Sequence, residues 1–135
     1  MINTLGRYLN ASTQAVASGG NILFTNNTFS NCSLGYDNLG GIQFKKSGTY
    51  LIFANFLSVA TAAGDLAVSM YKNGEVVPGA ITGGTAAANG DYLPLGITYI
   101  LTVKQSCPGE IATVTFKPAA ATSFNSASVI IEKVC

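Results

Sequence analysis

The chain has 135 residues, of which 48% are hydrophobic and only 10% are charged, and its formal net charge is +1. This length fits one domain with one core, and the small net charge provides no electrostatic attraction for nucleic acid or for anionic membranes. The absence of histidine excludes Ser-His-Asp and Cys-His nucleophiles, and a surface poor in charge is typical of a durable extracellular or particle-borne β-protein.

The amino-terminal residues, MINTLGRYLNAST, contain no continuous apolar segment that could serve as a secretory signal. No stretch approaches the roughly 20 apolar residues that span a membrane. We expect residues 1–13 to form a short arm that docks onto another virion or spore-coat protein, and residues 14–135 to form the single domain.

Short strands separated by turns are predicted along the whole chain, because no segment keeps the 3.6-residue apolar period of a helix. The predicted strands cover residues 13–25 with a break near Ser18, then 35–44, 50–60, 65–72, 75–81, 91–104, 110–117 and 127–134. Asn73-Gly74 is the strongest hairpin signal, since both residue types tolerate positive φ. Residues 83–89 are predicted to form a small, flexible loop. This pattern indicates an all-β fold with two sheets, a sandwich or jelly roll.

Residues 50–60, YLIFANFLSVA, are apolar on both faces of the predicted strand. Strands 91–104 and 127–134 are nearly as apolar on both faces, whereas 110–117 places threonines opposite its apolar residues. One sheet is therefore expected to be buried on both faces (the dry sheet), and the other to have an outer face exposed to solvent (the wet sheet). Because the domain core covers only one face of each sheet, the dry sheet needs a second copy of the chain.

A family resemblance is carried by SGTYLIFANFLSVA, LAVSMYKNGEVVPGA, NGDYLPLG and ATVTFKPAAATSFNSASVIIEKVC, in this order and spacing. They resemble the jelly roll of the tumour necrosis factor (TNF) and C1q superfamily. The similarity is greatest to its bacterial branch, the carboxy-terminal domains of exosporium collagen-like glycoproteins and structural proteins of phages and prophages of Gram-positive bacteria. It covers roughly residues 14–135, but the chain has no Gly-X-Y stalk.

The resemblance implies a compact homotrimer in which the sheet containing strands 50–60, 91–104 and 127–134 faces a threefold axis. The Phe56 face and the Phe53 face of strand 50–60 are both apolar enough to line this axis. The face with Tyr50, Ile52 and Phe56 is the preferred one, which would leave Leu51, Phe53 and Leu57 in the core. The residues predicted at the trimer interface are Tyr50, Ile52, Phe56, Tyr92, Ile100, Val129 and Ile131.

The three cysteines, Cys32, Cys107 and Cys135, show no C-x-x-C spacing, so no zinc site is predicted. From the residues alone, one disulfide with a leftover thiol, three buried thiols and an intermolecular bridge all remain open. The strand order implied by the resemblance brings the loop after Val103 to the same end of the sandwich as the chain terminus, which implies a Cys107–Cys135 disulfide.

No catalytic or cofactor-binding site is predicted, because the six carboxylates are scattered singly. The sequence favours a non-enzymatic structural or recognition module on a particle surface, first as a phage or prophage virion decoration, fibre or receptor-binding protein. A spore-surface protein and a soluble TNF-like receptor ligand are the alternatives. A host-surface glycan or protein is a further predicted partner, bound by loops. The candidate recognition residues are Asn26, Asn31, Thr85, Asn89, Ser123 and Asn125.

Overall fold

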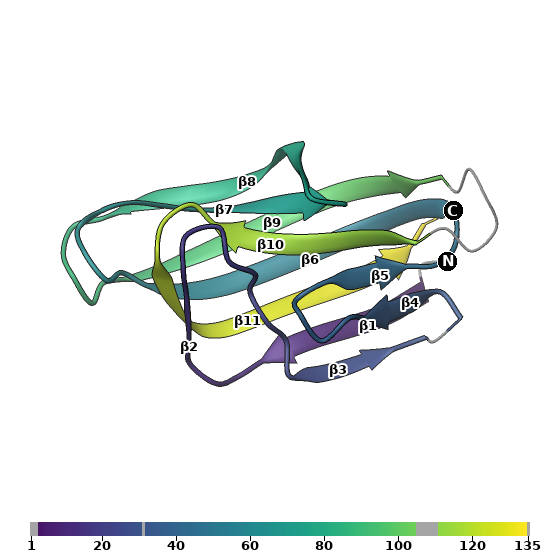
Figure 1. Cartoon of the computed structure of the whole chain (residues 1–135), viewed down its shortest axis with the longest axis horizontal. Helices are drawn as coiled ribbons and strands as arrows, with labels where there is room; N and C mark the ends of the chain where they lie inside the picture. The colour runs from purple at the N-terminus through teal and green to yellow at the C-terminus, as the bar shows by residue number, and fades with distance from the viewer. Residues whose placement is uncertain (1–2, 31, 105–110, 135) are drawn as a thin grey trace.

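Two antiparallel sheets face each other in the computed structural model, which describes residues 3–30, 32–104 and 111–134 (Figure 1). The β6 sheet has the strand order β3-β1-β11-β6-β9, and β2 also pairs with β11. Its strands are β1 (Asn3–Asn10), β2 (Gln14–Val16), β3 (Asn26–Phe29), β6 (Gly48–Val59), β9 (Tyr92–Val103) and β11 (Thr122–Lys133).

The β10 sheet has the strand order β4-β5-β10-β7-β8 and lies in front of the β6 sheet in Figure 1. Its strands are β4 (Leu34–Tyr36), β5 (Ile42–Phe44), β7 (Gly64–Lys72), β8 (Glu75–Ala86) and β10 (Ala112–Pro118). The chain crosses repeatedly from one sheet to the other, as in a jelly roll. The prediction of an all-β, two-sheet fold is confirmed, and the described residues contain no helix.

The core fills the space between the sheets with one alternating set of side chains from most strands. Phe56 of β6 lies at its centre, with its ring centroid 5.4 Å from that of Phe116 and 6.0 Å from that of Phe124. Towards the β1 side, Tyr8 contacts Phe24 and Tyr36, with centroid separations of 6.3 and 5.8 Å. Aromatic side chains therefore join strands of both sheets.

The buried tyrosines keep their hydroxyl groups satisfied. The Tyr8 hydroxyl donates to the carbonyl of Gly35 at 3.1 Å, and the Tyr50 hydroxyl donates to the carbonyl of Lys46 at 2.6 Å. Burial raises the pKa of both phenols above the ordinary value, because the charged phenolate would lose its hydration. Both side chains stay neutral donors over the physiological range.

The amino-terminal segment corrects the predicted domain boundary. Asn3–Asn10 is not part of an arm outside the domain, because it forms β1 and pairs with both β11 and β3. Its backbone groups are occupied by these two neighbours, so this segment is not available as an extended docking arm. The domain includes β1 for this reason.

Several predicted strand bounds also differ from the structure. Of the strand predicted at residues 13–25, only β2 (Gln14–Val16) is formed. The expected strand at 35–44 is split into β4 and β5 by a turn in which Asn38 and Gly40 have φ values of 64° and 92°. In that turn the Asp37 carboxylate accepts the N–H of Leu39 at 2.7 Å and of Gly41 at 2.8 Å. Strand β8 continues into the predicted flexible loop as far as Ala86, and β11 begins before residue 127 because its start pairs with β2 and β6.

The Asn73-Gly74 hairpin between β7 and β8 is confirmed. Asn73 and Gly74 have φ values of 52° and 85°, the left-handed conformations that the two-residue turn requires. The Asn73 side-chain oxygen also accepts the N–H of Thr113 at 2.9 Å, which ties the hairpin to the neighbouring strand β10.

Candidate self-association surface

The outer face of the β6 sheet, which points away from the β10 sheet, carries a band of apolar side chains. The band runs along β6, where every second residue points outward, and spreads onto the two neighbouring strands. We call this band the outer apolar face. Its members are Leu51, Phe53, Leu57 and Val59 on β6, Tyr92, Pro94 and Ile100 on β9, and Ile130 on β11.

Strand pairing explains why these side chains form one surface. Leu51 lies opposite Ile100 on β9, and Phe53 lies opposite Ile130 on β11, so the apolar side chains are direct cross-strand neighbours. Tyr92 and Ile100 remain 61% and 62% exposed. A contiguous exposed apolar surface of this kind marks an interaction site rather than a solvated face.

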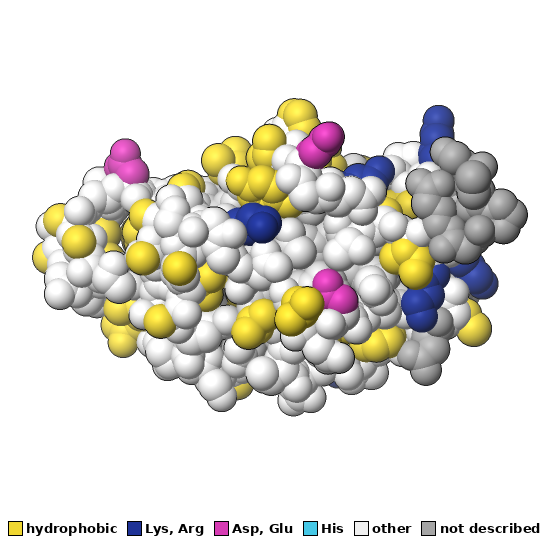
Figure 2. Space-filling view, viewed as in Figure 1, with side chains coloured by type: hydrophobic (Ala, Val, Ile, Leu, Met, Phe, Trp, Pro, Cys, Tyr) yellow, Lys and Arg dark blue, Asp and Glu magenta, His cyan; other side chains and the backbone are white. Residues whose placement is uncertain are grey.

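The outer face of the β10 sheet is different. Thr113 and Thr115 of β10 point outward there, and the ammonium group of Lys117 lies 5.4 Å from the centroid of the Tyr71 ring. Figure 2 shows this side of the molecule as mostly backbone and uncharged polar side chains, with hydrophobic side chains gathered mainly near β8 at its upper edge. The outer face of the β6 sheet is therefore the more apolar of the two along β6, although Ser126, Ser128 and Glu132 of β11 also point outward there.

The predicted interface residues fall into two groups. Tyr92 and Ile100 lie on the outer apolar face, as expected for residues that could contact another chain. The assignment of the other five is wrong, because their side chains are at most 2% exposed and lie in the core between the two sheets. These five are Tyr50, Ile52, Phe56, Val129 and Ile131.

The two faces of β6 were therefore exchanged in the sequence-based prediction. The sequence does contain a signal for the correct orientation, since Asn55 shares its face with Leu51 and Phe53, and Glu132 of β11 shares its face with Ile130. An amide and a carboxylate are disfavoured in a dry core. Giving these two polar side chains more weight than the aromatic ones would have placed the Phe53 face outside.

Charges are confined to one margin of this surface. Arg7 of β1 lies opposite Ile130 and is exposed, and Glu132 lies two residues further along β11. Together with Thr28 and Phe29 they line a hollow at the β3 side of the sheet. The centre of the outer apolar face is uncharged, so burying it against another chain carries no cost of removing a charge from water.

The candidate recognition residues are only partly brought together. Thr85 and Asn89 lie near the β8–β9 connection, where the Thr85 hydroxyl donates to the Asp65 carboxylate at 2.8 Å. Ser123 and Asn125 lie in the first part of β11, and the Asn125 side-chain oxygen accepts the Thr13 hydroxyl at 3.2 Å. Asn26 instead begins β3, at the far margin of the β6 sheet. Asn31 lies outside the described residues.

The predicted disulfide joins Cys107 and Cys135, and both of these residues lie outside the described residues. Cys32 is exposed and is not in a disulfide. Within the described ranges, no three acidic or cysteine side chains are grouped closely enough to hold a metal ion. The same residues contain no helix that is long and apolar enough to cross a membrane.

Comparison with known proteins identifies the fold. No protein-family profile matches the sequence, and no curated protein matches it. The Eiger TNF of S. frugiperda matches in structure with a TM-score of 0.76 and 8% identity, over 99% of this chain and 93% of that one. The globular domain of zebrafish complement 1qA matches with a TM-score of 0.70 and 13% identity, over 98% of this chain and 97% of that one. The chain has the jelly-roll fold of TNF and C1q domains.

Proposed function

We propose that this chain assembles into a homotrimer through the outer apolar face and acts as a non-enzymatic structural or recognition module on a particle surface. The observation that carries the proposal is the position of the apolar band on β11, β6 and the edge strand β9 of a sheet whose other face already covers the core. A second copy of the chain is the partner that is always available to cover it.

The choice of three copies in the proposed assembly comes from the resemblance to the TNF and C1q superfamily. The outer apolar face extends onto β9, the edge strand of the sheet, so one copy can contact the face of its neighbour with its own edge. Contacts between two different patches of the same chain close into rings, and a trimer is the ring that the resemblance implies.

The particle is a phage or prophage virion in this proposal, where the chain serves as a decoration, fibre or receptor-binding protein. Its support is compositional: only 10% of the residues are charged, as in durable surface proteins. Antibodies raised against the folded protein are expected to label intact particles from an induced culture. Labelling of spores instead would contradict the virion assignment and leave self-association intact.

Recognition by the polar residues around the β8–β9 connection and the start of β11 is a further part of the proposal. The connection is already ordered, since the Asp91 carboxylate accepts the N–H groups of Ala87 and Ala88 at 3.1 and 3.0 Å. A preordered loop binds with a smaller entropy loss. Alanine substitution of Asn89 and Ser123 is expected to weaken attachment to host cells, and unchanged attachment by an intact trimer would argue against this role.

Self-association is tested by light scattering. The protein is expected to have about three times the chain mass of 13.9 kDa, with no monomer at micromolar concentration. Ile100→Asp is expected to shift the mass to that of the monomer, because it places a charge on the outer apolar face. The side chain is 62% exposed, so the substitution costs the isolated fold little.

Ile81→Asp is the matched control. Ile81 is 61% exposed and lies on β8, the edge strand of the other sheet. This variant is expected to keep the trimeric mass. A monomeric parent protein would contradict self-association, and equal dissociation of the two variants would contradict the choice of face.

A further inference from the structure

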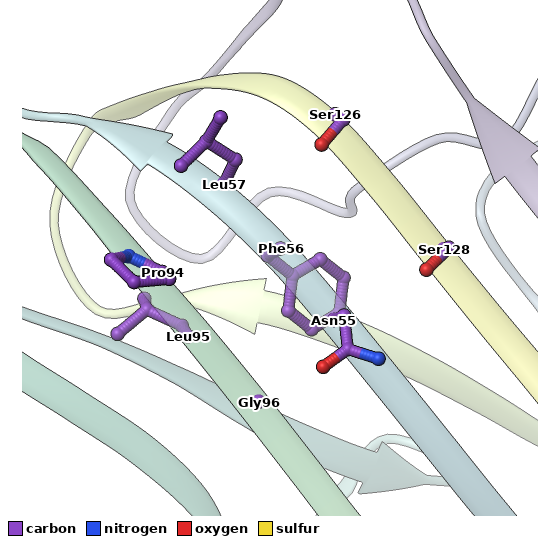
Figure 3. A pocket seen from close by; sticks show the side chains of 8 residues that line it. All are labelled: Asn55, Phe56, Leu57, Pro94, Leu95, Gly96, Ser126 and Ser128. Atoms are coloured by element: carbon purple, nitrogen blue, oxygen red, sulfur yellow. The ribbon is translucent and has the colours of Figure 1, made fainter.

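A polar hollow interrupts the outer apolar face at its centre. Asn55 on β6 lies between Gly96 on β9 and Ser128 on β11, and Ser126 lies one outward position further along β11. The hollow has a volume of about 280 Å³ and is flanked by Leu57 and Pro94. Figure 3 shows the side chains of Asn55 and Leu57 on β6, between the proline of β9 and the two serines of β11.

The position of Asn55 within its strand is the first unexplained feature. The outward residues of β6 from Leu51 to Val59 are all apolar except this central one, which is exposed in the single chain. Asn55 does not pack in the core, because its side chain points away from it. It is not part of a polar sheet surface either, because the outward residues on both sides of it along the strand are Phe53 and Leu57. A polar residue enclosed by an apolar surface needs another explanation.

The lack of a side chain at Gly96 shapes the hollow. A Cβ atom built there would lie 3.1 Å from the side-chain oxygen of Asn55, closer than ordinary van der Waals contact. The Asn55 amide group therefore lies over the backbone of β9. A residue larger than glycine at position 96 would displace this amide group. Small residues on both neighbouring strands leave the amide accessible from outside the sheet.

The second feature is that the polar groups of the hollow have no partners within the chain. Among the described residues, no hydrogen bond is made by the side chains of Asn55, Ser126 or Ser128. Water can satisfy them while the surface is open. Once the surrounding apolar side chains are covered, each polar group left unpaired would destabilise the assembly, because it would lose its hydrogen bonds to water. The covering surface must supply hydrogen-bond partners at this place.

We infer that the Asn55 side chains of three copies meet around the threefold axis and hydrogen-bond to one another, so that Asn55 fixes the register and the number of copies in the assembly. This inference rests on the proposed self-association through the outer apolar face. A cyclic axis brings a residue close to it opposite its own copies. Each amide has both donors and an acceptor, so three amides form a closed ring in which each donates to the next.

The physical role follows from the cost of a mismatched arrangement. An apolar surface can be buried in many registers at similar free energy, whereas three amides are paired only when the copies share one height and one rotation. A single buried asparagine fixes register and copy number in coiled coils in the same way, at some expense in stability. Ser126 and Ser128 supply additional hydroxyl groups next to the ring.

Disulfide trapping tests whether the three side chains meet. Asn55→Cys is introduced into a chain in which Cys32, Cys107 and Cys135 are replaced by serine, and the assembled protein is oxidised with diamide. One disulfide joins two of three thiols on the axis and leaves the third reduced. About two thirds of the chains should therefore run as dimers and one third as monomers on a denaturing gel. Thr115→Cys, on the outer face of the β10 sheet, is the control that stays monomeric on the gel.

The effect on specificity is tested in the otherwise unchanged chain. Asn55→Leu is expected to give assemblies that resist heat better than the parent but show more than one mass by light scattering. A trimer of Asn55→Cys chains without cross-linking, or a single trimeric mass for Asn55→Leu, would overturn the inference and leave the trimer standing. A parent chain that is monomeric by light scattering would instead overturn the proposed function itself.

Discussion

At the scale of single residues, two residues of the same type on one strand can lie on opposite faces of the sheet. Phe56 and Phe53 are both aromatic residues of β6, yet one is 2% exposed in the core and the other lies on the outer apolar face. Their residue type does not distinguish them. The strand alternates its side chains between two surfaces, so the difference lies only in the direction of each side chain.

Substitution of the core ring is expected to be costly. Phe56→Ala removes contacts with Phe116 and Phe124 and leaves a cavity, so the free energy of unfolding should fall by about 3–5 kcal/mol. Urea unfolding at fixed protein concentration measures this loss. Tyr71→Ala, which removes a half-buried ring from the outer face of the β10 sheet, should cost clearly less. Equal losses would contradict the assignment of Phe56 to the core centre.

Alkaline pH is expected to destabilise the fold through its buried tyrosines. Burial raises the pKa of Tyr8 above its value in the unfolded chain, so the folded state keeps this proton when the unfolded state releases it. The stabilisation is complete below about pH 10 and is lost as the pH rises further, by up to about 1.4 kcal/mol per pH unit for one tyrosine. Urea unfolding between pH 8 and 11 measures the slope. A Tyr8→Phe variant should lose stability less steeply above pH 10, and an unchanged slope would contradict this linkage.

At the scale of elements, the strands with strong patterns were predictable. Strands β6, β7 and β9 lie within one or two residues of their predicted bounds, because each has a long apolar alternation that ends at a turn residue. By contrast, β1 and β3 have sequences, NTLGRYLN and NNTF, with too few apolar residues for such a pattern. They become strands because β11 offers β1 a free edge, and β1 then offers one to β3.

The hairpin between β7 and β8 depends on backbone conformation rather than on packing. Gly74 has a φ of 85° and no atom within 4 Å of a Cβ built on it, so Gly74→Ala is expected to cost about 1–2 kcal/mol through the left-handed conformation alone. Thermal unfolding provides the comparison. Gly84→Ala is the control, because the nearest atom is a Leu93 methyl at 3.7 Å and the conformation suits an L-residue. A loss at Gly84 as large as that at Gly74 would contradict the conformational explanation.

At the scale of the whole molecule, the proposed assembly is held by apolar contact. The net charge of the chain is +1, and Arg7 and Glu132 lie only at the margin of the outer apolar face. Salt screens charges but does not weaken apolar contact. The dissociation constant of the trimer is therefore expected to stay the same or to fall as the NaCl concentration rises from about 50 mM to about 1 M. Sedimentation over this range measures it, and a tenfold or larger rise would contradict an apolar interface.

The sequence alone determined that the protein is an all-β, two-sheet domain and that β6 has two largely apolar faces, because alternation and turn chemistry are local properties. Only the tertiary structure decided which face of β6 lies in the core. That choice depends on which side the β10 sheet covers, and both Phe53 and Phe56 satisfy the local pattern. The same packing decided that Asn55 stands in the middle of an open apolar surface, since its surroundings come from β9 and β11, far away in sequence.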